Sequence, residues 1–311
     1  MKIYHSIQEF SPAKKTIVTL GTFDGVHKGH KSILEKLKNS SKETGCESVV
    51  LTFFPHPRMV LQQADGLKLL NTMDEKAYLL DLFGIDNLIV HPFSKEFSRL
   101  AAEEFVKDVL VDRLNIKKII IGHDHRFGRN RTADINDLIQ FGQQYGFEVE
   151  QITALEVEEV SVSSTKIRNA LNEGLISKAN RYLGYPYFIT GKVVTGKQLG
   201  RTIDFPTANI KLTEDYKLVP AHGVYTVSAM INGKMVLGMM NIGTRPTVDG
   251  TTETIEVHFF DFNSDIYNAQ LRINLHHRLR FEQKFDSIDA LKQQLAADKE
   301  SSVQYFKEKG L

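Results

Sequence analysis

Short apolar runs alternate with amphipathic stretches through the first half of the chain. The runs are rich in β-branched residues and bounded by turn residues, which is typical of short buried strands. They cover residues 16–20, 48–54, 87–93, 117–122 and 147–152. An amphipathic stretch follows each run, and in the first one Ile33, Leu34 and Leu37 share a helical face. Because parallel strands need crossover connections, this alternation predicts an α/β domain with a parallel sheet.

The pattern changes near residue 185. Gly184 ends a helical stretch, and Pro186 discourages its continuation. Strand patterns without intervening helices follow at 187–196, 223–243, 254–262 and 270–280. Asn232-Gly233 within the second of these is a strong signal for a type I′ hairpin turn. Ser287 is the expected N-cap of a last helix, so this half is predicted to be a small antiparallel β-barrel with a terminal helix.

Length and composition fit a two-domain globular protein. The 311 residues exceed one ordinary domain of about 100–200 residues, and we place the domains at 1–184 and 185–311. Lys and Arg number 39 and Asp and Glu 38, a balance that does not favour broad binding to nucleic acid or membrane surfaces. The single cysteine, Cys46, excludes an internal disulfide framework and fits a reducing compartment. With no apolar leader or membrane-length run visible, we expect a cytoplasmic protein that binds neither nucleic acid nor membranes.

The densest chemical signal is GTFDGVHKGH at 21–30, directly after the first predicted strand and at the start of the first helix. A helix N-terminus offers unpaired N–H groups and partial positive charge, which suit phosphate. His27 and His30 can donate to phosphate oxygens whose charge grows during transfer. The other expected ATP or phosphate contacts are Gly21, Phe23, Asp24, Gly25 and Gly29. The segment is neither a P-loop nor a dinucleotide fingerprint, and the alternative is a glycine-rich turn with two surface histidines.

A second cluster, SVSSTKIR at 161–168, places hydroxyl groups at the start of another predicted helix. Ser163 or Ser164 can cap this helix, and Arg168 lies one turn inside it. Ser164, Thr165 and Arg168 are therefore candidates for a second phosphate contact. Taken alone, the cluster also fits an ordinary capped helix that carries an arginine.

Together, 21–30, 53–57, 122–131 and 161–168 resemble the FMN adenylyltransferase domain of bacterial bifunctional riboflavin kinase/FAD synthetases, within the nucleotidyltransferase superfamily. The resemblance implies a Rossmann-like domain that joins FMN to the AMP part of ATP. It also implies flavin contacts from Phe54, Pro55, His56, Asp124 and Phe127. Two positions depart from the family pattern: Ala133 replaces a usual glycine, and His125 stands where phenylalanine is common.

The second half resembles the riboflavin kinase domain of the same family, through 196–210, 223–225, 241–247, 254–262 and 278–287. Thr207 and Asn209 offer hard oxygen ligands suited to Mg²⁺ against ATP phosphates. Glu256 matches the family's catalytic glutamate and alternates with the apolar positions of its strand, so it can face a cavity as general base. Gly196, Gly200 and Arg201 are the expected phosphate-covering loop, and Arg280 is an expected flavin contact.

Asp204 replaces a glycine that is common before FPTAN in this family. Its carboxylate is expected to weaken ATP binding unless it points away from the phosphates.

These motifs predict a bifunctional enzyme that phosphorylates riboflavin to FMN and then adenylylates FMN to FAD, with ATP, riboflavin and FMN as its partners and Mg²⁺ as cofactor. Two alternatives stay open at this point. One is a flavin- or nucleotide-binding regulatory homologue with one or both activities impaired. The other is a nucleotidyltransferase with a different acceptor, because the HxGH motif at 27–30 does not by itself indicate which molecule receives the nucleotide.

Overall fold

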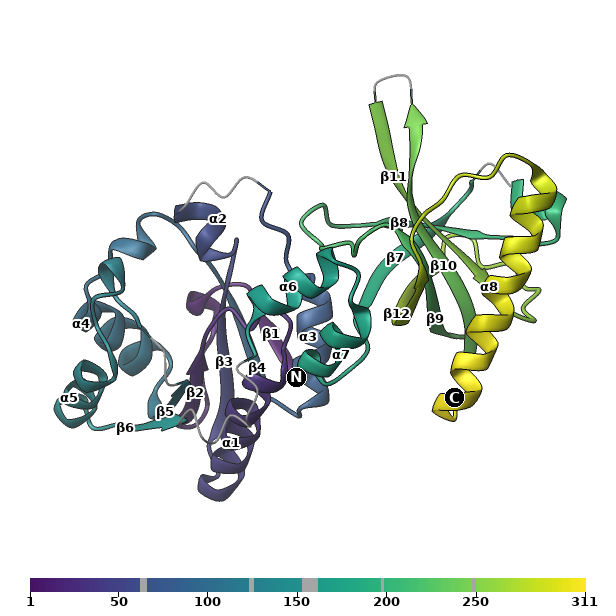
Figure 1. Ribbon diagram of the computed structural model, residues 1–311. Helices are drawn as coiled ribbons and strands as arrows, with labels where there is room; N and C mark the ends of the chain where they lie inside the picture. The colour runs from purple at the N-terminus through teal and green to yellow at the C-terminus, as the bar shows by residue number, and fades with distance from the viewer. Residues whose placement is uncertain (62–65, 123–125, 153–161, 197–198, 248–249) are drawn as a thin grey trace. The chain divides into compact units, whose positions relative to one another are not determined.

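A computed structural model describes residues 1–61, 66–122, 126–152, 162–196, 199–247 and 250–311 (Figure 1). The chain divides into two compact units, Met1–Ser163 and Ser164–Leu311. Within the described residues, no helix is both long enough and apolar enough to cross a membrane.

The first unit is built on a six-stranded parallel sheet in the order β1-β4-β3-β2-β5-β6. Its strands are β1 Lys2–Tyr4, β2 Thr16–Leu20, β3 Glu47–Phe54, β4 Asn87–Pro92, β5 Ile116–Gly122 and β6 Glu148–Ile152. The parallel α/β prediction is confirmed. Every residue of β2 is buried, which is why this strand reads as a continuous apolar run. The three-residue strand β1 was not predicted, because KIY is too short to carry a pattern.

Helices connect these strands. They are α1 Lys28–Thr44, α2 Pro57–Leu61, α3 Met73–Leu82, α4 Ala102–Glu104, the π-helix η3 Phe105–Arg113 and α5 Ile135–Tyr145. Short 3₁₀ turns lie at η1 Ile7–Glu9, η2 Phe97–Arg99 and η4 Arg129–Arg131. The chain runs from β2 through β3 to β4 on one side and then returns to place β5 on the other side of β2. The order therefore reverses at β2, and open α/β sheets bind ligands beyond the carboxyl end of a strand at such a point.

The second unit is a closed barrel in the order β10-β11-β8-β7-β12-β9, as predicted. Its strands are β7 Phe188–Val194, β8 Ala208–Leu212, β9 Gly223–Ile231, β10 Lys234–Thr247, β11 Gly250–Phe259 and β12 Gln270–Arg280, and a 3₁₀ turn, η5, covers Leu199–Ile203. Asn232 and Gly233 both have positive φ, which is the I′ hairpin geometry expected between β9 and β10. Strand β8 was not predicted, because it is short and its first two residues, Ala208 and Asn209, belong to the FPTAN motif.

The described part of this second unit also contains the helices α6 Ser164–Asn172, α7 Ile176–Leu183 and α8 Ile288–Lys309. Helix α8 begins at Ser287, whose side chain accepts from the Ala290 N–H, as expected, and it runs along the barrel (Figure 1). Helices α6 and α7 lie before Gly184, so the predicted domains 1–184 and 185–311 would place them in the first domain. That boundary stays a prediction. These two helices join the barrel through hydrogen bonds such as that from Ala221 N–H to the Leu171 carbonyl.

Candidate active sites

The turn from β2 into α1 carries the GTFDGVHKGH motif at the reversal point of the sheet. Two of its non-glycine residues, Phe23 and Val26, have φ of 45° and 37°. The left-handed region is costly for bulky and β-branched side chains, so the surrounding structure must hold this turn in place. Asp24 is 1% exposed, and its Oδ1 accepts from the Leu70 N–H at 2.9 Å. The loop before α3 therefore packs onto the turn.

His27 and His30 lie together at the first turn of α1. Their rings stack with centroids 3.7 Å apart, and the His27 N–H donates to Nδ1 of His30 at 3.3 Å. Burial lowers the pKa of His27 to about 4 and holds the pKa of His30 well below its usual value, with charge on His27 and Lys76 adding to the effect at His30. Both rings are therefore neutral near pH 7. Because Nδ1 of His30 accepts, its proton is on Nε2, which leaves Nε2–H as the donor.

The other predicted contacts of the first unit differ in position. Phe23 is buried and packs on the His30 ring at 4.9 Å. At the end of β3, Phe54 is half-buried and Pro55 is exposed, while His56 is buried with Nδ1 accepting from the Arg58 N–H at 3.1 Å. Asp124 lies outside the described residues.

Phe127 lies in the hydrophobic core of the first unit, with its ring 6.2 Å from that of Phe105. Two backbone hydrogen bonds, of 3.1 and 3.2 Å, join Phe127 to Ala133, which is itself 5% exposed. Alanine thus fits the position where the family usually has glycine. Contact of Phe127 with flavin stays a prediction.

Ser164, Thr165 and Arg168 lie in the first turns of α6, in the second compact unit. Thr165 is exposed, and Ser164 and Arg168 are half-buried. Their role as phosphate contacts stays a prediction.

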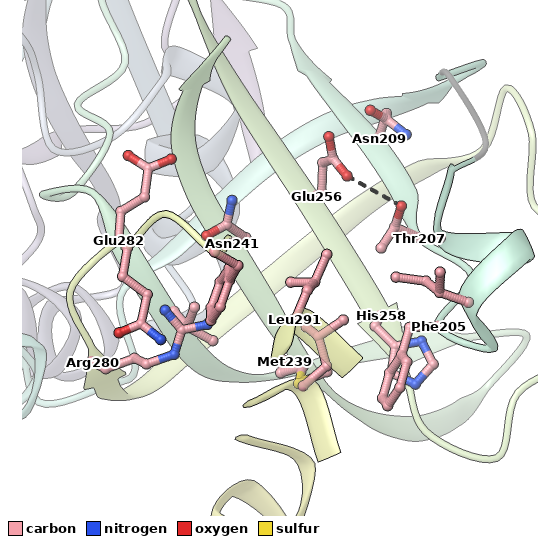
Figure 2. A pocket seen from close by; sticks show the side chains of 16 residues that line it. Phe205, Thr207, Asn209, Met239, Asn241, Glu256, His258, Arg280, Glu282 and Leu291 are labelled. Carbon is pink, nitrogen blue, oxygen red and sulfur yellow. Dashed lines mark hydrogen bonds between the residues drawn. The ribbon is translucent and has the colours of Figure 1, made fainter. Parts of the chain in front are cut away.

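The barrel contains a pocket of about 280 Å³ on the side that faces α8 (Figure 2). Apolar side chains form much of its wall: Ile203, Phe205, Val224, Met239, Phe285, Leu291 and Leu295. Thr207, Asn209 and Glu256 lie near one another and form what we call its polar end (Figure 2), and further polar residues also line the pocket: Asn241, His258, Arg280, Glu282 and Gln283. An apolar cavity with a few convergent polar groups is the usual form of a small-molecule site.

Glu256 is central to the polar end. It pairs with Asn209 of β8 on one side and with Asn241 of β10 on the other. Its strand neighbours Ile255 and Val257 are buried on the opposite face. The Thr207 hydroxyl donates to Oε2 of Glu256 at 3.3 Å (Figure 2). The structure therefore brings together the Thr207 and Asn209 pair and Glu256, which the sequence had singled out in two separate motifs.

A second pocket, of about 630 Å³, lies beside the first in the same unit. Alternate residues of β11 face the two pockets: Glu256 and His258 line the first, and Val257 and Phe259 line the second. The loop 262–267 completes the second pocket. Thr207 lines both pockets and so marks where their contents would meet.

Two glycines of the loop before β8 allow close packing there. A Cβ at Gly196 would overlap the side-chain amide of Asn209, and a Cβ at Gly200 would overlap the Phe205 carbonyl. At Gly200 the obstacle is backbone, so a side chain there would force the loop to move, whereas at Gly196 the Asn209 amide would have to shift. The side chain of Arg201 lies outside the described part of the chain.

Arg280 lines the first pocket, but its guanidinium is held by Asp298 of α8. Nε donates to Oδ1 at 3.0 Å and Nη2 to Oδ2 at 2.8 Å, while Nη1 donates to the Phe281 carbonyl at 3.1 Å. Asp298 is 3% exposed, so the pair is largely removed from water. A flavin contact from Arg280 stays a prediction.

Sequence reasoning assigned no role to Asp298 or Asn241. Asn241 could have been found, because it opens the 241–247 segment that carries part of the family resemblance. Asp298 had no such signal. Asp204 has φ of 64°, which explains why glycine is common there, and its side chain is 92% exposed at the rim of the second pocket.

A parallel sheet with a histidine-bearing turn at its reversal point is typical of a nucleotidyltransferase unit. A closed barrel with a carboxylate beside hydroxyl and amide oxygens is compatible with a small-molecule kinase unit. Comparison with known protein families agrees with both assignments. The FAD synthetase family model matches residues 10–166, and the riboflavin kinase model matches residues 183–306. The chain belongs to the family of bifunctional riboflavin kinase/FMN adenylyltransferases.

Curated relatives carry this name in full. The protein of Escherichia coli (strain K12) is 36% identical over 309 residues, covering 98% of each chain. That of Listeria monocytogenes is 37% identical over 292 residues, covering 93% of this chain and 92% of the relative.

A solved structure from Streptococcus pneumoniae, titled a macrolide-efflux protein, matches with a TM-score of 0.88 and 33% identity over 97% of this chain and 98% of that one.

The family fixes the two reactions. The enzyme phosphorylates riboflavin with ATP to give FMN, and it adenylylates FMN with a second ATP to give FAD and pyrophosphate. The bifunctional prediction is thereby confirmed, and no comparison favours the regulatory alternative or a different acceptor.

Proposed function

We propose that the barrel pocket lined by α8 binds riboflavin, that the adjoining pocket binds ATP, and that Glu256 is the general base between them. The observation that carries this proposal is the place of Thr207, which lines both pockets and donates to the Glu256 carboxylate. The apolar walls of the first pocket suit a flavin ring. The polar end suits the ribityl chain whose terminal hydroxyl reacts.

The oxygen donors beside Glu256 fit a magnesium ion held against ATP phosphates. The Thr207 hydroxyl and the Asn209 amide oxygen are hard ligands, and both line the same pocket. Asn209 is also packed against the Gly196 backbone, which limits the freedom of its amide. When bound, the ion would neutralise charge that develops on the phosphates.

The kinase step then uses the chain's own groups as follows. Glu256 takes the proton of the ribityl hydroxyl, whose oxygen attacks the γ-phosphorus of ATP while ADP leaves. Thr207 orients the Glu256 carboxylate for this transfer. Gly196, Gly200 and Arg201 cover the phosphates and exclude water, and Arg280 supports the flavin side of the pocket.

In the first unit, His27 and His30 act at the α-phosphate of ATP. A phosphate oxygen of FMN attacks the α-phosphorus, and pyrophosphate leaves. The Nε2–H of His30 donates to the oxygens whose charge grows. Gly21, Gly25 and Gly29 let the backbone approach, and Ser164, Thr165 and Arg168 hold the β- and γ-phosphates. Phe54, Pro55, His56, Asp124 and Phe127 form the FMN side.

The kinase assignment is tested with Glu256→Gln in the full chain, given riboflavin and ATP and then supplied FMN and ATP. We expect FMN formation to fall at least about 100-fold, because a general base contributes roughly 10²–10⁴. FAD formation from supplied FMN should persist. Glu253→Gln is the matched control, since Glu253 is an exposed glutamate on the same strand. Equal loss of both activities in a folded Glu256→Gln protein contradicts the assignment.

The adenylylation assignment is tested with the reciprocal variant, His30→Ala. We expect FAD formation to stop while FMN continues to accumulate. His5→Ala, at an exposed position of the same unit, is the control. Retained FAD formation in His30→Ala would refute the proposed role.

We further propose that the enzyme works in the cytoplasm, where ATP and Mg²⁺ are abundant. Cell fractionation with an antibody to the chain tests this location.

A further inference from the structure

Lys76 of α3 is a buried lysine to which no role has yet been given. Its side chain is 3% exposed, and its Nζ donates to the Thr22 carbonyl at 2.7 Å. Thr22 lies in the turn from β2 into α1, and the charge of Asp24 in the same turn attracts the ammonium. Burying a lysine is costly unless it is paired, so these contacts define its environment.

The turn needs support from outside itself. Phe23 and Val26 are both in the left-handed region, and a strained backbone persists only where its surroundings hold it. Support comes from the segment that leads into α3. The Leu70 N–H holds Asp24, and a capping box between Thr72 and Glu75 fixes the start of the helix. Lys76 adds a contact one turn further along α3.

We propose that Lys76 is a positioning residue for adenylyl transfer, which anchors the strained turn so that His27 and His30 meet the α-phosphate of ATP. This inference rests on the proposed roles of the two histidines. Lys76 acts through the turn and does not itself touch the reacting atoms.

The charge on Lys76 gives the proposal a signature in pH. Burial lowers the pKa of Lys76 to about 8, and attraction to Asp24 opposes this shift. The lysine is therefore charged at neutral pH and loses its proton as the pH rises through about 8. Its charge also contributes, after burial and His27, to the low pKa of His30. Among the described residues, the groups that face it are Asp24 and His30, with Glu75 adjacent on its own helix.

The test compares Lys76→Met and Lys76→Arg with the unaltered full chain between about pH 6 and pH 9.5. We expect Lys76→Met to lower kcat for FAD formation from supplied FMN by about 100-fold, because a small misplacement of catalytic groups costs this much. In the unaltered enzyme, kcat for FAD formation should fall as the pH rises above about 8. This fall should be absent in Lys76→Met, which has no ammonium to lose. Lys76→Arg should retain more activity and keep it at high pH, since a guanidinium does not titrate there.

Two controls separate this role from a general effect on folding. Kinase activity in the same chain should be unchanged in both variants, and Lys42→Met removes an exposed lysine of α1 in the same unit. Hydrogen exchange of β2 reports whether the first unit is folded.

The proposal is overturned if Lys76→Met keeps FAD formation within twofold of the unaltered enzyme with the same alkaline decline. If Lys76→Met does not fold, Lys76→Arg decides, and an unchanged alkaline decline in that variant is equally decisive against it. The proposed role of the histidines is tested separately: it would be wrong if His30→Ala still formed FAD.

Discussion

The hydroxyl of Thr207, the residue just before β8, donates a hydrogen bond of 3.3 Å to Oε2 of Glu256 in β11, 49 residues further along the chain (Figure 2). This contact joins a proposed magnesium ligand to the proposed general base. The position of one therefore depends on the position of the other, and a change at Thr207 should affect both metal use and proton transfer.

Thr207→Ala should raise the Mg²⁺ concentration needed for half-maximal kinase activity and lower kcat, by about tenfold in each case, because a charge-assisted hydrogen bond contributes roughly 1.5–3 kcal/mol. Thr207→Ser keeps the hydroxyl and should restore most of both. Initial rates of FMN formation across a Mg²⁺ series provide the measurement. Adenylylation in the same chain is the control, and an unaltered Mg²⁺ dependence in Thr207→Ala would argue against ligation by Thr207.

The Arg280–Asp298 pair should hold α8 beside the proposed riboflavin pocket. Asp298→Asn leaves a largely buried guanidinium without its charge partner, and breaking such pairs typically costs about 3–5 kcal/mol. We expect faster hydrogen exchange in α8 and a raised KM for riboflavin. Asp261→Asn is the control, because Asp261 is 94% exposed and lies 3.9 Å from Lys299. Unchanged exchange and KM in Asp298→Asn would show that the pair does not shape the pocket.

Asp204 tests the effect of a carboxylate at the rim of the proposed ATP pocket. Asp204→Gly should lower the KM for ATP by at most about threefold, because exposed charges interact weakly, and the difference should shrink in high salt. The φ of 64° suits glycine, so folding should be retained. Kinase kinetics at low and high salt give the answer, and a large, salt-independent change would mean that Asp204 acts by direct contact.

His27 should make the first unit sensitive to acid. The pKa of His27 is lowered to about 4, whereas the unfolded histidine titrates near 6.5. Between these values the unfolded state binds more protons, so the free energy of unfolding falls as the pH is lowered through this window. The full effect is about 3 kcal/mol at 1.36 kcal/mol per pH unit.

Hydrogen exchange of β2 between pH 6.5 and pH 4.5 checks this prediction once intrinsic exchange rates are corrected for. His27→Gln should reduce the dependence, with the part due to His30 remaining, whereas His5→Ala should leave it unchanged. If His27→Gln retains the full dependence, the acid sensitivity comes from other groups.

Much of the architecture followed from local pattern. The continuous apolar run of β2, the I′ turn at Asn232-Gly233 and the Ser287 cap are each properties of a few neighbouring residues. The chemical motifs were also local, because phosphate turns are built from consecutive backbone groups. Periodicity and turn chemistry therefore predicted the α/β unit, the barrel and the phosphate-binding candidates at 21–30 and 164–168, whereas the resemblance to known enzymes supplied the catalytic glutamate and the flavin contacts.

Only the tertiary structure decided which distant side chains meet. It placed Glu256 opposite Asn209 and Asn241 in the strand register, brought the Lys76 ammonium to the Thr22 carbonyl, and joined Arg280 to Asp298 by hydrogen bonds. None of these contacts is visible in sequence spacing, because strand register and helix packing set them over many intervening residues. Burial then determines their chemistry. It lowers the pKa of His27 and Lys76, since removing water penalises the charged form, and burial exists only once the chain has folded.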